Sequence, residues 1–391
     1  MNKKVGLAIV TYTINYGTYL QAFATQEYIK KIGYETEIIN IESVIKDVEK
    51  RRRKYFFSRL LNFSEVKSYL PAIKLLVNKK INKKFRSYYL RRKKKFDEFH
   101  DRFFKIGPIC DSWSGLESRC LNFSSVVVGS DQLWRPANIA GNFYTLNFVP
   151  KNINKISYAT SFGLNEIRKK QRDTVRSFLD RIQFLSTREE SGATIIKACT
   201  GRVASVVCDP TMLLTSKEWN SYAGVNPLVE DKYVFIYMLN DNKKQRQYIK
   251  NFAKQKSLKI VGVLHGAGFV KGDDKFVDEA PADIGPFEFL NLIKNASYVF
   301  TDSFHGSVFS ILFEKQLFVF KRFSDKNKMS TNSRVINLLS RLGLSNRLIE
   351  KETKCYPEDI HYKKVNEKLS LFRKYSEHFL TEALNAGAQK C

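Results

Sequence analysis

His305 is the residue of this chain whose type and position best suit acid–base chemistry. It lies in residues 301–306, TDSFHG, after an apolar run that predicts a strand and before residues 307–313, which predict a short helix. In parallel α/β sheets, ligands bind beyond the carboxyl ends of the strands. An imidazole there can gain or lose a proton near neutral pH, and a helix N-terminus favours an anion. The segment therefore predicts acid–base chemistry on a negatively charged substrate, and a histidine that only caps the helix is the structural alternative.

Arg188 offers a complementary group. It follows residues 184–187, which predict a strand, and precedes a loop that contains a glycine. A planar guanidinium can bind a carboxylate or a phosphate through two parallel hydrogen bonds. Arg188 is therefore predicted to bind an anion, and an ion pair with Glu189 or Glu190 is the alternative.

Strands and helices alternate along the chain, and these elements must position the reactive side chains. We expect a strand, a helix from residue 20 to about 32 and a second strand at the start, and further helices near 166–180, 193–199, 243–254, 286–295, 335–342 and 363–388. This alternation predicts parallel sheets that are covered by helices on both faces. The strands are expected at 5–11, 35–40, 124–129, 155–159, 184–187, 203–207, 233–238, 259–263, 298–300 and 317–320.

The 391 residues of the chain predict two domains rather than one. We expect an N-terminal Rossmann-like domain over residues 1–208, a C-terminal one over 209–345 and a helical tail over 346–391. A basic helical insertion is expected in the first domain at about 46–105. Asp209-Pro210 is expected to be a structural elbow between the domains.

The formal net charge of +27 is concentrated in that insertion. Between Arg51 and Lys105 the sequence holds 19 Lys and Arg residues against 4 Asp and Glu residues. The difference of 15 positive charges is over half of the net charge of the chain. Apolar residues interleave with these charges, a pattern typical of a basic amphipathic surface. The pattern favours peripheral contact with an anionic membrane, and a helical insertion packed on the protein body is the alternative. Nucleic acid is disfavoured, because no RNP-type, zinc-finger or helix-turn-helix signature is present.

Several other classes of protein are disfavoured by the sequence. No apolar run approaches the roughly 20 residues that cross a bilayer, and the first residues lack the pattern of a secretion signal. The six cysteines lack CxxC spacing and are expected to be reduced thiols. We therefore expect a cytoplasmic protein, held peripherally at the inner face of the cell membrane. Neither a metal site nor a cofactor is expected, since the spacings typical of such sites are missing.

Seven motifs in order carry a family resemblance. They are NYGT at 15–18, GSDQLW at 129–134, SYATSFG at 157–163, STREESG at 186–192, CDPTMLL at 208–214, TDSFHG at 301–306 and NSR at 332–334. Over residues 5–344 the chain resembles the polysaccharide pyruvyl transferase family. The resemblance implies two Rossmann-like domains that face a cleft, similar to the GT-B glycosyltransferases. It also implies transfer of pyruvate from phosphoenolpyruvate to two hydroxyls of one sugar, which forms a ketal and releases phosphate.

The implied reaction needs an acid for the methylene carbon of the donor, a base for the sugar hydroxyls and cations for the phosphate and carboxylate. His305 and Asp131 are the expected catalytic residues, and capping of the next turn is the alternative for Asp131. The residues expected to bind the donor are Arg188, Arg334, Ser303, Asn332 and Lys321. Those expected at the acceptor or elsewhere in the cleft are Asn15, Gly17, Ser130, Gln132, Trp134, Ser161 and Asp302, and a buried aromatic is the alternative for Trp134.

The expected acceptor is a sugar in a cell-surface polysaccharide or in its lipid-linked precursor. Two other functions fit the same architecture. A nucleotide-sugar glycosyltransferase of the GT-B type would bind a nucleoside diphosphate instead of phosphoenolpyruvate. A non-catalytic glycan-binding protein would keep its affinity when His305 is replaced. The insertion matches none of the shared motifs, and because acceptor selectivity often lies in insertions, the sequence leaves the sugar unnamed.

Overall fold

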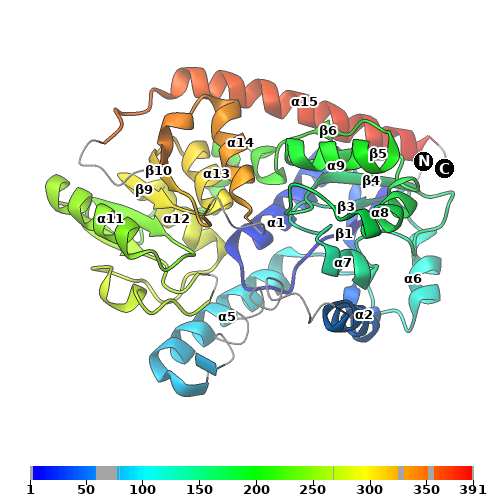
Figure 1. Cartoon of the computed structure of the whole chain (residues 1–391), viewed down its shortest axis with the longest axis horizontal. Helices are drawn as coiled ribbons and strands as arrows, with labels where there is room; N and C mark the ends of the chain where they lie inside the picture. The colour runs from blue at the N-terminus through cyan, green and yellow to red at the C-terminus, as the bar shows by residue number, and fades with distance from the viewer. Residues whose placement is uncertain are drawn as a thin grey trace.

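The computed structural model describes residues 3–58, 77–78, 80–266, 268–324, 330–350 and 356–389. Within these ranges the chain forms two parallel sheets, each flanked by helices and standing side by side (Figure 1). The sheets have six and five strands, and every pairing between neighbouring strands is parallel. The predicted fold class, two parallel α/β units, is therefore confirmed.

The first sheet follows the order β2-β1-β3-β4-β5-β6. Its strands are β1 (Lys4–Ala8), β2 (Glu35–Ile38), β3 (Ser125–Val128), β4 (Asn154–Thr160), β5 (Phe184–Thr187) and β6 (Ser205–Val206). Helices in this part of the chain are α1 (Tyr16–Lys31), α2 (Ile45–Phe57), α5 (Lys83–Phe103), α6 (Trp113–Cys120), α7 (Pro136–Gly141), α8 (Arg172–Leu179) and α9 (Glu190–Thr200).

The second sheet follows the order β11-β10-β9-β7-β8. Its strands are β7 (Tyr233–Tyr237), β8 (Lys259–Gly262), β9 (Tyr298–Thr301), β10 (Gln316–Phe320) and β11 (Leu348–Ile349). Helices around it are α10 (Ser216–Tyr222), α11 (Lys243–Lys256), α12 (Pro286–Asn295), α13 (Phe304–Leu312), α14 (Asn332–Leu342) and α15 (Tyr362–Ala388). All residues of the central strands β3 and β7 are buried, as expected of apolar, β-branched and aromatic runs covered on both faces.

Helices α1 and α13, whose first turns lie at the site described below, begin earlier than the sequence predicts. α1 starts four residues before the expected position 20, and α13 starts three residues before position 307. Each is started by an N-cap, which satisfies a free backbone N–H of the first turn. Asn15 Oδ1 accepts from Thr18 N at 3.1 Å, and Ser303 Oγ accepts from Gly306 N at 3.3 Å. His305 therefore lies in the first turn of α13 rather than in a loop before the helix.

The long helix α15 packs against both halves of the molecule and runs along one edge of it (Figure 1). Near its start, Tyr362 donates a hydrogen bond to the carbonyl of Lys315, which precedes β10. Farther along, Ser376 Oγ accepts from Cys208 N at 2.8 Å. Near its end, the carbonyl of Ala383 accepts a hydrogen bond from a side chain at the start of β4. The C-terminal helix therefore ties the two sheets together.

The helix α5 of the basic insertion turns its apolar face towards the protein body. Phe96 and Phe99 are buried, and the Phe96 ring lies 5.1 Å from the ring of Tyr16 in α1. The ring of Phe99 lies 4.8 Å from that of Phe287 in α12. In α5 the amphipathic pattern is thus explained by packing, which was the structural alternative.

The apolar stripe itself was expected at residues 55–77, and its part at 59–76 lies outside the described residues. Of the described part, Phe57 is 63% and Val77 is 47% exposed, so packing does not explain these two side chains.

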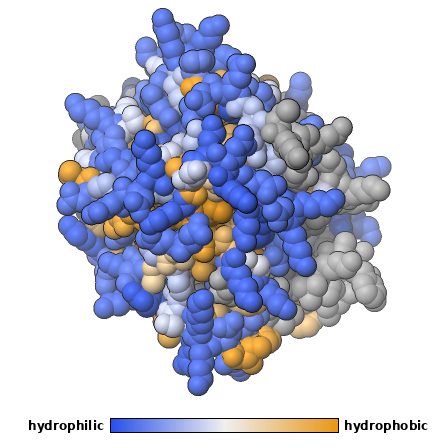
Figure 2. All heavy atoms as spheres, turned by 90° about the vertical axis from the view of Figure 1, so that its left-hand side faces the viewer, coloured by the Kyte–Doolittle hydropathy of each residue, from blue (hydrophilic) through white to orange (hydrophobic). Residues whose placement is uncertain are grey.

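Hydrophilic side chains dominate the side of the molecule that carries α11, with small hydrophobic patches between them (Figure 2). Among the helices of the described ranges, none combines the length and the apolar composition needed to cross a bilayer.

Replacing Leu380 by Ala tests whether α15 stabilises the fold. Leu380 is fully buried, so its truncation should lower the free energy of unfolding by about 2–5 kcal/mol in urea denaturation. Leu371 in the same helix is 69% exposed, and its replacement by Ala should change that free energy by less than about 0.5 kcal/mol. Equal losses in the two variants would contradict the packing of α15.

Candidate active site

The ends of the two sheets meet at a cavity that brings most of the predicted site residues together. Its volume is about 90 Å³. The first domain contributes the loop and helix start after β1 and the loop after β3, and the second contributes the segments after β9 and β10 and the start of α14. Among the predicted site residues, those that line the cavity are Asn15, Asp131, Gln132, Asp302, Ser303, His305, Lys321, Asn332 and Arg334.

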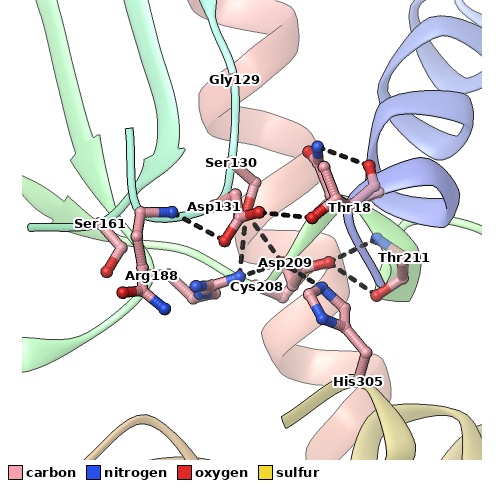
Figure 3. Close-up of polar contacts among 12 residues, drawn as sticks. Thr18, Gly129, Ser130, Asp131, Ser161, Arg188, Cys208, Asp209, Thr211 and His305 are labelled. Carbon is pink, nitrogen blue, oxygen red and sulfur yellow. Dashed lines mark hydrogen bonds and ion pairs between the residues drawn. The ribbon is translucent and has the colours of Figure 1, made fainter. Parts of the chain in front are cut away.

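His305 is held between the two domains. Its Nε2 lies 3.6 Å from Oδ2 of Asp209, and the imidazole is 7% exposed (Figure 3). The first turn of α1 packs directly on the ring, because a Cβ at Gly17 would lie only 2.0 Å from Nδ1. Gly17 was expected to bind a ligand. The structure shows instead that its missing side chain makes room for the imidazole.

Asp209 is the partner of His305 that the sequence did not identify. It was expected to be a structural elbow, yet its fully buried carboxylate faces the imidazole. Oδ2 accepts hydrogen bonds from Arg188 Nη1 at 2.7 Å and from Ser130 Oγ at 2.8 Å, and Oδ1 accepts one from Thr211 Oγ1 at 2.7 Å (Figure 3). Burial alone would raise the pKa of Asp209, but the charges of His305 and Arg188 hold it well below its usual range. The group is therefore an anion at neutral pH.

Arg188 lies behind this pair rather than in the cavity. Besides its bond to Asp209, its Nε lies 3.7 Å from the carboxylate of Glu189, so the ion pair that was the alternative is present. Burial opposes the charge, but these two carboxylates raise the pKa of Arg188 above its ordinary value. Arg188 also lines a neighbouring pocket, and its buried Nη2 has no hydrogen-bond partner in the described part of the chain. Arg188 therefore forms ion pairs with Asp209 and Glu189, while its Nη2 donates no hydrogen bond within the described residues.

Three cations from the second domain line the cavity. Arg334 donates two hydrogen bonds, at 2.9 and 3.1 Å, to the amide oxygen of Gln132, when that amide is oriented to face it. Burial and the nearby Arg188 lower the pKa of Arg334 to about 10, which leaves it charged at neutral pH. Lys321 forms an ion pair with a surface glutamate at 3.3 Å. Arg322, which like Lys321 follows β10 directly, lines the same cavity.

Asp131 adds a carboxylate from the first domain. Its Oδ2 accepts a hydrogen bond from Thr18 Oγ1 at 2.8 Å, and its Oδ1 accepts one from the backbone of Gln132. Its φ of 83° is unusual for a residue with a side chain, and such strain gathers at functional sites. Burial raises the pKa of Asp131, but the charges of Arg188 and His305 outweigh this and lower it. The hydroxyl of Thr18 is a contact that the sequence did not reveal.

Three predicted residues of the cleft are instead buried inside the first domain. Trp134 is 0% exposed and donates a hydrogen bond from Nε1 to a main-chain carbonyl at 3.0 Å, so it cannot stack on a sugar. Ser161 bonds to the carboxylate of Glu189, and Ser130 bonds to Asp209. These side chains point into the core or towards other polar groups, so their predicted roles at the acceptor are wrong.

Three cavity residues mainly hold loops in place. Ser303 is the N-cap of α13, as described above. Asn332 Oδ1 accepts from the backbone N of Arg322 at 3.1 Å and so fixes the segment after β10. Asp302 accepts from the backbone N atoms of Leu239 and the next residue, at 2.7 and 3.0 Å. Burial raises the pKa of Asp302 to about 6, although Arg322 acts in the opposite direction.

Comparison with known proteins identifies the family. Residues 15–322 match the family model for polysaccharide pyruvyl transferases, and the chain therefore belongs to this enzyme family. No curated protein sequence matches the chain significantly.

Solved structures give only distant likenesses. The UDP-GlcNAc 2-epimerase of Neisseria meningitidis, bound to UDP-GlcNAc, is 10% identical, with 97% of this chain and 94% of that chain covered and a TM-score of 0.47. The glycosyltransferase SnogD from Streptomyces nogalater is 9% identical over 100% of both chains, with a TM-score of 0.46. At this level of similarity neither structure carries information on function.

Replacing Gly17 by Ala tests the contact between α1 and the imidazole. The added methyl group would overlap His305, so the free energy of unfolding should fall by about 1–3 kcal/mol in urea denaturation. The control is the same change in a His305→Ala background, where the space is free and the loss should be under about 0.5 kcal/mol. Equal losses in both backgrounds would contradict the contact.

The pKa of Asp302 predicts a pH dependence of stability. Because folding raises this pKa from 3.8 to about 6, its contribution is fully present below pH 4 and is lost as the pH rises through 6. Asp302→Asn lacks this contribution. Between pH 4 and pH 7 the wild type should therefore lose about 1–3 kcal/mol of unfolding free energy relative to the variant. Urea denaturation at several pH values measures it, and a constant difference would contradict the assignment.

Proposed function

We propose that the protein transfers the pyruvate group of phosphoenolpyruvate to two hydroxyls of one sugar, in a cell-surface polysaccharide or its lipid-linked precursor, with release of phosphate. The observation that carries the proposal is the cavity itself. In a member of this family, it combines His305, backed by the buried carboxylate of Asp209, with cations from the second domain.

The charges of the cavity suit this donor. Phosphoenolpyruvate carries a phosphate and a carboxylate, and its binding requires several cations or N–H donors. Arg334 and Arg322 line the cavity and supply guanidinium groups, which bind such anions through paired hydrogen bonds. Lys321 adds an ammonium group, whose ion pair with a partly exposed glutamate can be exchanged for a substrate. Arg188 lines the adjoining pocket, which supports its expected role in donor binding.

Proton transfer is assigned to His305 and Asp131. A proton from His305 goes to the methylene carbon of the donor, C2 becomes electron-poor, and the first sugar hydroxyl forms a bond to C2. The bond between C2 and the phosphate oxygen then breaks, and the second hydroxyl closes the ketal. One of the two hydroxyl protons restores the acid and the other leaves on phosphate. Asp131 accepts a hydroxyl proton, and the buried carboxylate of Asp209 faces the imidazole at 3.6 Å.

We place the reaction at the cytoplasmic face of the membrane when the acceptor is lipid-linked. The support is the excess of basic residues in the insertion, since anionic lipids attract Lys and Arg. The apolar face of α5 adds no support, because it packs on α1 and α12.

Calorimetry with phosphoenolpyruvate tests the donor. The wild type should bind saturably, and Arg334→Ala should weaken binding about 10- to 100-fold, because a charge-assisted hydrogen bond contributes about 1.5–3 kcal/mol. The control is Arg176→Ala, since Arg176 is 63% exposed and lies in α8. His305→Ala should keep the donor affinity within a few-fold but lower sugar-dependent phosphate release about 10²–10⁴-fold.

The other functions make different predictions for the same proteins. A nucleotide-sugar glycosyltransferase would bind UDP tightly and phosphoenolpyruvate not at all. A non-catalytic glycan-binding protein would release no phosphate and would lose no glycan affinity in His305→Ala. Either result would overturn the proposed function.

A further inference from the structure

We infer that the pocket formed by α5 and the loops after β1 and β8 binds the hexopyranose ring of the acceptor. This second pocket is distinct from the cavity at His305 and from the pocket that Arg188 lines. The inference rests on the proposed function and adds the place where the sugar is held. The pocket lies outside every residue that the sequence motifs single out. Its walls come from both halves of the molecule, since the loop after β1 of the first sheet and the loop after β8 of the second both line it.

The size of the two spaces separates their roles. The cavity at His305 has a volume of about 90 Å³, whereas the second pocket has a volume of about 530 Å³. Small-molecule sites typically enclose about 300–1,000 Å³. A cavity of about 90 Å³ lined by three cations cannot hold the donor and a sugar ring together. A hexose acceptor therefore needs an adjoining space, and the second pocket has the required volume.

The lining of the second pocket suits a sugar. Tyr12, which is 47% exposed, and Tyr89 of α5 present aromatic surface to it. A pyranose has an apolar face of C–H groups that packs on such rings, and its hydroxyls need a few placed polar groups. Lys93 and Asp97, one turn apart on α5, form an ion pair at the same pocket and offer donors and an acceptor to those hydroxyls.

The second pocket is next to the reacting centre. Ile14 lines the second pocket, and the following residue, Asn15, lines the cavity that contains His305. Consecutive Cα atoms lie only about 3.8 Å apart. The two spaces therefore adjoin at the turn between β1 and α1.

The second pocket is also held rigid across the domains. Arg92 of α5 is 4% exposed and donates hydrogen bonds to the main-chain carbonyls of Leu264 and His265 in the loop after β8. The hydroxyl of Tyr88 donates to the carbonyl of Pro281 at 2.7 Å. A site that is organised before binding loses less entropy when a ligand enters. The long basic helix thus forms one wall of a prepared site.

Binding of simple hexosides tests the inference. The probes are the p-nitrophenyl β-glycosides of glucose, galactose, mannose and N-acetylglucosamine, titrated up to about 20 mM, with saturation-transfer NMR as the readout. At least one should bind the wild type. Tyr89→Ala and Asp97→Asn should each weaken that binding at least 10-fold, while calorimetric affinity for phosphoenolpyruvate stays within 2-fold. The control is Tyr375→Ala, because Tyr375 is 51% exposed and lies in α15.

The outcomes separate this inference from the proposed function. If no hexoside binds, or if binding is unchanged in both α5 variants, the assignment of the second pocket fails, while the donor measurement stands. If hexosides bind as expected but phosphoenolpyruvate does not, the proposed function fails and the sugar site remains. If UDP binds and is lost in Tyr89→Ala, the second pocket holds a nucleoside, and the inference is overturned. Both variants change partly exposed side chains, and a circular dichroism melt confirms that they fold.

Discussion

The candidate active site depends on one buried negative charge, that of Asp209. A carboxylate removed from water costs several kcal/mol unless it is paired and fully hydrogen-bonded. Here Arg188 and Ser130 supply the partners from the first domain, and His305 faces it from the second. The carboxylate keeps Arg188 in place and lies 3.6 Å from the imidazole. Because its partners come from both sheets, the geometry of the site depends on how the two domains are docked.

The docking in turn depends on α15. The backbone N of Cys208, the residue before Asp209, donates to Ser376 Oγ in the middle of that helix, while the ends of the helix contact the two different sheets. A change in the packing of α15 would therefore shift the backbone of Cys208 and, with it, the carboxylate of the next residue, Asp209. For this reason the stability of the helix and the integrity of the active site are coupled, although α15 does not line the cavity at His305.

The local patterns of the sequence predict the strands and most helices, because these depend on runs of apolar residues and on caps nearby in the chain. Helix α12 has the predicted bounds. The contacts of Asp209 and Thr18 could not be predicted, since each joins residues about a hundred positions apart. Trp134 shows a second limit. A motif places a residue after a strand but does not say whether its side chain turns to the cleft or to the core.

The basic helix α5 shows how a charge pattern can mislead and still inform. Amphipathic spacing says that one face of a helix is covered, but it does not say what covers it. For α5 the cover is α1 and α12, so the apolar residues of this helix serve packing. Part of the polar side of α5 lines the second pocket. A reaction that joins a small trianion to a neutral sugar needs two unlike environments side by side, one strongly cationic and one aromatic. The cationic cavity at His305 and the aromatic pocket adjoin at the turn between β1 and α1, and only the aromatic pocket is lined by α5.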